Sequence, residues 1–136
     1  MQAAMGSVQL AKLERILSRK TENANWMEER LANVDGVQVP ARLPDRSHPY
    51  MLYTLSAPSK RDAIMTALLE AGIESKVYFP PAHLQPIFGG TDGDRLPATE
   101  EAAERILSIP FHSRLGSREL EEIAATIEGA SGRRVE

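Results

Sequence analysis

The N-terminal segment has the residue pattern of one long helix. Residues 2–33 contain no proline and one glycine, and apolar side chains recur at helical spacing. This stripe consists of Leu10, Leu13, Leu17, Ala24, Met27 and Leu31. A second stripe lies beside it in the first half of the segment, at Ala3, Ala4, Met5, Val8 and Ala11. A surface helix needs one stripe, so we expect this helix either to be buried deep in its own domain or to serve two partners.

Four short segments that are rich in apolar and aromatic residues predict strands. They cover residues 37–40, 50–55, 74–79 and 107–110. Pro40 suits an edge strand, because proline has no N–H to donate to a neighbour. In the third segment, alternation places Ser75, Val77 and Phe79 on one face, and Glu74, Lys76 and Tyr78 on the other.

Three further helices are predicted among these strands. Ser59 is expected to cap the first, which ends at Gly72, while the second covers residues 99–106 and the third begins at Ser117. Strands that alternate with helices predict an α/β fold, in which a small, mainly antiparallel sheet has helices packed on one side. We expect one domain over residues 1–128, followed by a flexible tail at residues 129–136.

A long loop separates the last two predicted strands. Residues 80–98 contain four prolines and three glycines, which predicts a segment without regular structure, and such long loops usually have a function. Pro80 and Pro81 restrict the backbone and place His83 just beyond a strand end. The glycine-rich run at residues 89–94 lacks the lysine of a phosphate loop and the closing glutamate of a calcium loop, so we expect no site there.

Composition limits the classes of protein that fit. The chain has 136 residues, no cysteine and a net charge of −3. Its lysines and arginines are scattered along the sequence, so no nucleic-acid partner is expected. It has neither a signal-peptide pattern nor an apolar run long enough to cross a membrane, so we expect a soluble protein with no membrane partner. The absence of cysteine suits the cytoplasm.

The residues alone predict no self-sufficient catalytic set and no metal site. The three histidines, His48, His83 and His112, lie in loops, and none has the helical spacing of a metal-binding pair. A lysine that forms a Schiff base with a carbonyl cofactor needs a desolvated pocket. All four lysines are interpreted instead as solvated surface residues; they are Lys12, Lys20, Lys60 and Lys76.

Several motifs resemble the DegT/StrS family of aminotransferases. The first is Gln2-Ala3-Ala4-Met5-Gly6-Ser7-Val8-Gln9-Leu10, which is similar to the helix that follows the Asn-x-Arg-Met turn of that family. The others are Ala71-Gly72-Ile73-Glu74-Ser75-Lys76-Val77-Tyr78-Phe79-Pro80-Pro81, His83-Leu84-Gln85-Pro86, Leu96-Pro97-Ala98-Thr99-Glu100 and Leu107-Ser108-Ile109-Pro110-Phe111-His112. Their order and spacing agree over nearly the whole chain. Phe79 departs from the pattern, because the family often has tyrosine at this position.

This resemblance implies a C-terminal small domain of a fold-type I enzyme. The family uses pyridoxal phosphate to transfer an amino group onto a keto sugar that is attached to a nucleotide. The resemblance places the Schiff-base lysine, the aspartate that pairs with the cofactor and most phosphate ligands in a large domain upstream of Met1. It therefore implies no catalytic and no cofactor-binding residue in this chain, and no pyridoxal phosphate bound by the chain alone.

The resemblance also implies which residues contact substrate and which partners the chain has. His83 and Tyr78 are expected to bind the nucleotide sugar, because in the family this loop borders the sugar-nucleotide cleft. The partners implied are the large domain or a second subunit, most simply in a homodimer. The alternative for His83 is a structural bond to a nearby carbonyl. The alternative for the whole chain is a free-standing, non-catalytic binding or dimerisation module that retains the small-domain fold.

Overall fold

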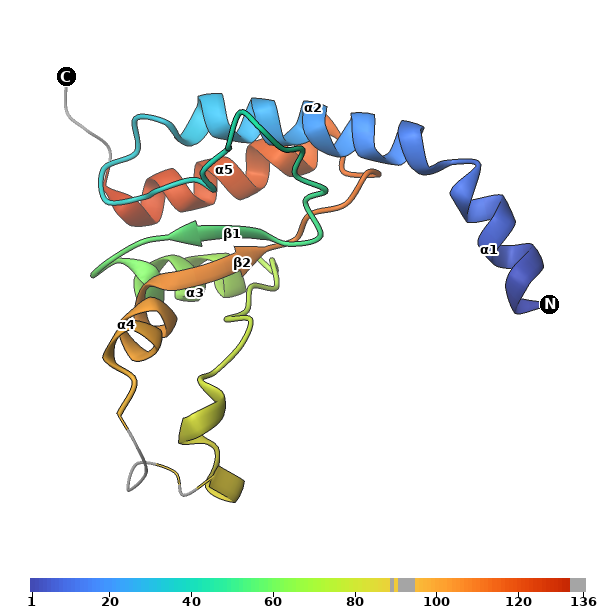
Figure 1. The fold of residues 1–136 in the computed structure, drawn as a ribbon. Coiled ribbons are helices and arrows are strands. Elements are labelled where there is room, and N and C mark those ends of the chain that lie inside the picture. The colour runs from blue at the N-terminus through green and yellow to red at the C-terminus, as the bar shows by residue number, and fades with distance from the viewer. Residues whose placement is uncertain (89, 91–94, 133–136) are drawn as a thin grey trace.

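The computed structural model describes residues 1–88, 90 and 95–132. Over these residues the chain forms five α-helices, two strands and two 3-10 helices (Figure 1). The elements are α1 (Gln2–Leu10), α2 (Leu13–Leu31), β1 (Tyr53–Ser56), α3 (Arg61–Glu70), η1 (Ala82–Leu84), η2 (Pro86–Phe88), α4 (Pro97–Arg105), β2 (Ile106–Ile109) and α5 (Ser117–Ser131). No helix in the described part of the chain is both long and apolar enough to span a membrane.

The predicted N-terminal helix is divided in two. The break lies at Ala11 and Lys12, where the Lys12 N–H donates to the Gln9 carbonyl at 3.0 Å, one residue closer along the chain than in an α-helix. From this junction α1 turns away from the rest of the molecule (Figure 1). No residue of α1 is buried, and Leu10 and Leu13 of the predicted core stripe are exposed too. Of the two alternatives, the prediction that this half of the helix is buried in its own domain is therefore wrong for the described residues.

The sheet is antiparallel and contains β1 and β2. Tyr53 pairs with Ile109 and Leu55 pairs with Leu107, and all four side chains are buried. On the other face the hydroxyl oxygens of Thr54 and Ser108 are 2.8 Å apart. The sheet therefore has one apolar face, and the other face carries hydroxyl groups.

Two predicted strands are reduced to single bridges. Residues 37–40 contribute the Gln38–Ser56 bridge, and residues 74–79 contribute the Lys76–Ser108 bridge. Prolines explain why the pairing stops, because they lack the N–H that the next pair needs. Continuing the two registers would set Pro40 opposite Thr54 and Pro110 opposite Glu74.

Three helices cover the apolar face of the sheet. α5 packs against both α3 and α2, and Figure 1 shows α2 and α5 running side by side above the strands. The core residues that the helices contribute are Ala24, Met27 and Leu31 from α2, Ile64 and Leu68 from α3, and Leu120, Ile123, Ala124 and Ile127 from α5. The predicted fold class, α/β with a small antiparallel sheet, is confirmed.

Several predicted boundaries differ in detail. Ser59 does not cap α3, because its own φ is +65° and the cap residue is Lys60. α5 continues to Ser131, whose side chain is buried, so residues 129–131 are helical and not part of a tail. The loop predicted at residues 80–98 contains η1 and η2, and α4 begins within it, at Pro97. The glycine-rich run at residues 89–94 lies outside the described residues except for Gly90.

Candidate functional site

The segment between the sheet and α4 carries the predicted substrate-binding residues. It leaves the sheet after Lys76, extends away from the core and returns through α4 (Figure 1). Its apolar side chains are strongly exposed: Phe79 is 74%, Ile87 84% and Phe88 65% accessible. An extension with this much exposed apolar surface is typical of a segment that contacts another molecule or domain.

His83 lies in η1 and binds the carboxylate of Glu100 in α4. Its Nε2 is 3.3 Å from Glu100 Oε1, and the exposed fractions of the two side chains are 15% and 14%. An ionised carboxylate can only accept a hydrogen bond, so Nε2 donates to it, and in the neutral imidazole Nδ1 is left as an acceptor. The alternative given for His83 was a bond to a nearby carbonyl, whereas the partner in the structure is the side chain of Glu100.

Glu100 joins the two ends of the segment. Besides His83, it accepts hydrogen bonds from the Leu96 N–H at 2.9 Å and from Arg95 Nε at 2.9 and 3.0 Å. Arg95 Nη2 is 2.6 Å from the same carboxylate. The Arg95 guanidinium, and next the Leu96 N–H, lower the pKa of Glu100 from 4.5 to about 2. Glu100 is therefore ionised at neutral pH and holds His83 in one orientation.

The sequence did not reveal Glu100 as part of this site. Glu100 contributed to the family motif, but nothing in the spacing joined it to a histidine seventeen residues earlier. One local signal was available, because a glutamate in the first turn of a helix often accepts the N–H of the cap residue. The bond from Leu96 to Glu100 is of this kind.

Tyr78 lies apart from His83. Its side chain is 39% exposed and meets the Phe79 ring edge to face, with 5.1 Å between ring centroids. It lines a hollow of about 220 Å³ at the end of the sheet, together with Lys76 and Phe111. Within the described residues no hydrogen bond joins Tyr78 to His83, so the two predicted residues sit in different surroundings.

Three of the four lysines have contacts that differ from those that a Schiff-base lysine requires. Lys76 Nζ is 2.6 Å from Glu74, whose hydrogen bond raises the pKa of Lys76, and a raised pKa disfavours the neutral amine that a Schiff base requires. Lys20 donates to the Tyr50 carbonyl at 2.6 Å, and Lys60 donates to the Ser131 carbonyl at 2.7 Å. The interpretation of all four as solvated was wrong for Lys12, Lys20 and Lys60, which are half-buried, and only Lys76 is exposed. Among the described residues no cluster of acidic or imidazole groups could hold a metal ion.

Comparison with known families identifies the chain. A family model described as the DegT/DnrJ/EryC1/StrS aminotransferase family matches residues 1–128. The chain belongs to this aminotransferase family. The resemblance in its motifs is thereby confirmed.

Two relatives illustrate the match. The dTDP-4-dehydro-2,3,6-trideoxy-D-glucose 4-aminotransferase of Saccharopolyspora spinosa is 36% identical over 96% of this chain and 34% of that enzyme. The UDP-N-acetyl-3-dehydro-alpha-D-glucosamine 3-aminotransferase of Acidithiobacillus ferrooxidans is 31% identical over 93% of this chain and 34% of that enzyme. The chain thus spans about a third of the length of these relatives.

Two solved aminotransferase structures illustrate the similarity in fold. TlmJ, an aminotransferase from Streptoalloteichus hindustanus, has a TM-score of 0.87 and 31% identity, over 94% of this chain and 35% of its own. DesV from S. venezuelae has a TM-score of 0.88 and 27% identity, over 99% of this chain and 37% of its own. The described architecture is therefore that of one part of a fold-type I aminotransferase.

Proposed function

We propose that this DegT/StrS family member acts as the C-terminal part of a pyridoxal-phosphate-dependent aminotransferase for nucleotide-linked keto sugars, in the cytoplasm. The observation that carries the proposal is the family match over residues 1–128. The names of the two relatives describe amino transfer on dTDP- and UDP-linked sugars. On this proposal the chain is not catalytic alone. It completes a substrate cleft whose cofactor is held by residues of the other two thirds of the enzyme.

The role proposed for the 78–88 segment is to contact the sugar nucleotide. When bound, pyridoxal phosphate would carry the amino group from an amino donor to the keto sugar and would supply the electron withdrawal for that transfer. In this chain, the neutral form of His83 presents Nδ1 as an acceptor for a substrate hydroxyl, because Glu100 occupies Nε2. Tyr78 adds an exposed phenol at the base of the segment. Glu100 is a positioning residue, since it acts through His83.

The partners proposed are the large domain and a second subunit. The apolar side chains of α1 are exposed along its length, with Met5 at 64% and Val8 at 55% accessibility. Small and apolar side chains on an uncovered helix favour close approach of another surface. We therefore propose that α1 packs against the large domain or against the partner subunit of a homodimer.

The test is to restore the enzyme by fusing this chain to the N-terminal two thirds of a close relative and to measure sugar-nucleotide transamination. His83→Ala should raise KM by roughly threefold to tenfold with little change in kcat, as expected for the loss of one neutral hydrogen bond. Glu100→Gln should raise KM in the same direction, because the amide no longer holds His83 as the ionised carboxylate does. Glu101→Gln is the matched control, since Glu101 is exposed and pairs with Arg105.

The two proposed functions give different results in this assay. An active fusion whose KM is unchanged by His83→Ala would remove the proposed substrate contact but leave the aminotransferase assignment intact. Fusions to several relatives that fold and bind cofactor but never transaminate would favour the alternative of a non-catalytic binding or dimerisation module.

A further inference from the structure

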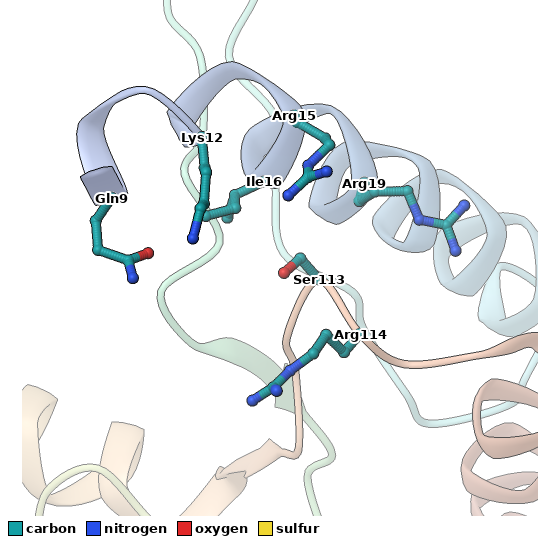
Figure 2. Close-up of a pocket in the computed structure, with 7 residues that line it drawn as sticks. All are labelled: Gln9, Lys12, Arg15, Ile16, Arg19, Ser113 and Arg114. Carbon is teal, nitrogen blue, oxygen red and sulfur yellow. The ribbon is translucent and has the colours of Figure 1, made fainter. Parts of the chain in front are cut away.

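The junction of α1 and α2 forms one side of a cationic hollow. Its volume is about 530 Å³, within the range of small-molecule sites. Its polar lining comes from Gln9, Lys12, Arg15, Arg19, Ser113 and Arg114. Figure 2 shows that Lys12 and Arg15 extend from the helix side toward Ser113 and Arg114 on the loop after β2. Residues nearly a hundred positions apart in the sequence thus line one hollow with four cationic side chains, of which Arg19 extends away from the other three in Figure 2.

These charges lack the partners that cations elsewhere in the molecule have. Arg30, Arg42 and Arg105 each form an ion pair with a glutamate. In the hollow, Arg19 pairs with Glu22 at 3.0 Å, and no ion pair within the described residues includes Lys12, Arg15 or Arg114. Like charges that face one hollow repel one another, so an arrangement of this kind is stabilised when an anion binds between them.

The loop side of the hollow is held firmly in place. Phe111 and Leu115, which flank Ser113 and Arg114, are both buried. The buried Asn23 of α2 donates toward the carbonyl oxygens of His112 and Leu115, each at 3.4 Å. The Arg114 N–H donates to His112 Nδ1 at 3.3 Å. The backbone that carries Arg114 is therefore fixed relative to α2, which carries Arg15.

We propose that this hollow is a binding site for a phosphate-bearing small molecule that carries a diphosphate group. Arginine favours phosphate because its planar guanidinium donates two parallel hydrogen bonds, and two arginines with one lysine match the several charges of a diphosphate. Ser113 and Gln9 add neutral donors at the same hollow. The site shares no residue with the His83–Glu100–Arg95 cluster, and it does not depend on the proposed amino transfer.

The test is calorimetric titration of the isolated chain with inorganic pyrophosphate at low ionic strength. We expect saturable binding with one site per chain, an affinity that falls as salt is added, and weaker binding of inorganic phosphate. Arg15→Gln and Arg114→Gln should each weaken pyrophosphate binding by roughly tenfold, since each removes one charge-assisted contact. Arg118→Gln is the control, because Arg118 is an exposed arginine in the first turn of α5, away from the hollow.

Three results would overturn the proposal. The first is no pyrophosphate binding by a chain that is folded by circular dichroism. The second is an equal loss of affinity in the Arg118→Gln control, which would mean non-specific attraction to the surface. The third is binding of a short glutamate-rich peptide but not of pyrophosphate, which would assign the hollow to carboxylates of a protein partner.

Discussion

Two tyrosine hydroxyls in the core have different surroundings. The Tyr50 hydroxyl donates to Glu28 at 3.2 Å, whereas the buried Tyr53 hydroxyl has no hydrogen-bond partner among the described residues. Burial of this hydroxyl raises the pKa of Tyr53 well above its ordinary value.

The first prediction compares the phenylalanine variants of these two residues. Tyr53→Phe removes an unpaired buried hydroxyl and should leave the free energy of unfolding unchanged or raise it by up to about 1 kcal/mol. Tyr50→Phe removes a made hydrogen bond and should lower that free energy by about 1 kcal/mol. Urea unfolding followed by circular dichroism measures both, and a larger loss for Tyr53→Phe than for Tyr50→Phe would contradict the assignment.

The second prediction concerns acid and the 78–88 segment. The pKa of Glu100 is about 2 in the folded chain, below its ordinary value of 4.5. Because the folded pKa is the lower one, ionised Glu100 stabilises the segment above about pH 4.5, and this stabilisation is lost as the pH falls toward 2. The protection factors of the amides in η1 and of Leu96, which correct for the intrinsic pH dependence of hydrogen exchange, should therefore fall over this interval.

Variants of adjacent glutamates provide the control for the acid experiment. In Glu100→Gln the same amides should exchange faster already at neutral pH and lose most of their acid dependence. Glu101→Gln should behave as the parent does, because Glu101 contacts Arg105 and not His83. If both variants kept the parent's profile, Glu100 would not be the group that titrates.

At the scale of single residues, the sequence predicts the role of a side chain where that role depends on neighbours in the sequence. It does not predict contacts with residues that only the fold brings near. His83 was singled out from its neighbouring prolines, but its contact with Glu100 depends on how the long segment returns through α4. The cations were interpreted as scattered, and along the sequence they are. Arg114 joins Lys12 and Arg15 because the loop after β2 packs under α2, and no sequence spacing contains that information.

At the scale of elements, helical periodicity located the helices but not their interruptions. Lys12, at φ −100° and ψ −3°, departs from helical values, but no proline or glycine marks this break between α1 and α2, and the apolar stripe continues across it in the sequence. The strands predicted at residues 37–40 and 74–79 are present only as single bridges, at Gln38 and Lys76. Their pairing was overestimated, because the prolines that end it, Pro40 and Pro110, act through the register with a neighbouring strand.

The third prediction tests how α3 ends. Gly72 has φ of +74°, its N–H donates to the Leu69 carbonyl, and the Ile73 N–H donates to the Leu68 carbonyl, which is a Schellman motif. Gly72→Ala should lower the free energy of unfolding by about 1 kcal/mol, because a side chain disfavours this backbone conformation. Gly129 provides the matched comparison inside α5, where an added methyl group meets open space.

Gly129→Ala should raise the free energy of unfolding by up to about 1 kcal/mol, since alanine favours a helix interior more than glycine does. Thermal and urea unfolding of the two variants side by side measure the difference. An unchanged free energy of unfolding is the result expected for the predicted tail from residue 129, and destabilisation would contradict a helix with open space at this position.

At the scale of the whole molecule, the exposed face of α1 leads to the fourth prediction. Met5 and Val8 lie on a helix with no buried residue, and apolar surface of this kind favours association. The isolated chain should form a twofold dimer at high concentration in sedimentation equilibrium. Met5→Glu should shift it toward monomer, whereas Leu69→Glu, on the exposed side of α3, should not. A parent chain that stays monomeric at high concentration would contradict the prediction.

The fifth prediction is that the isolated chain forms no stoichiometric adduct with pyridoxal phosphate. A productive lysine needs a low pKa and a pocket that excludes water, because the neutral amine is the nucleophile. The amines of Lys20 and Lys60 are held by carbonyl oxygens, and Glu74 raises the pKa of Lys76. Lys12 remains, and its location beside Arg15 and Arg114 favours attraction of the cofactor's phosphate.

Because cations surround Lys12, the experiment must measure covalent labelling of each lysine and not binding of the cofactor alone. After mixing with cofactor and reduction with borohydride, intact mass should show a low, distributed level of labelling and no single modified lysine. If Lys12 were modified stoichiometrically, pyrophosphate should compete for the same hollow, and Arg114→Gln should reduce the labelling. Stoichiometric modification of Lys20 or Lys60 would require the hydrogen bonds to the Tyr50 and Ser131 carbonyls to open. That result would refute the prediction that this chain lacks a lysine suited to the cofactor.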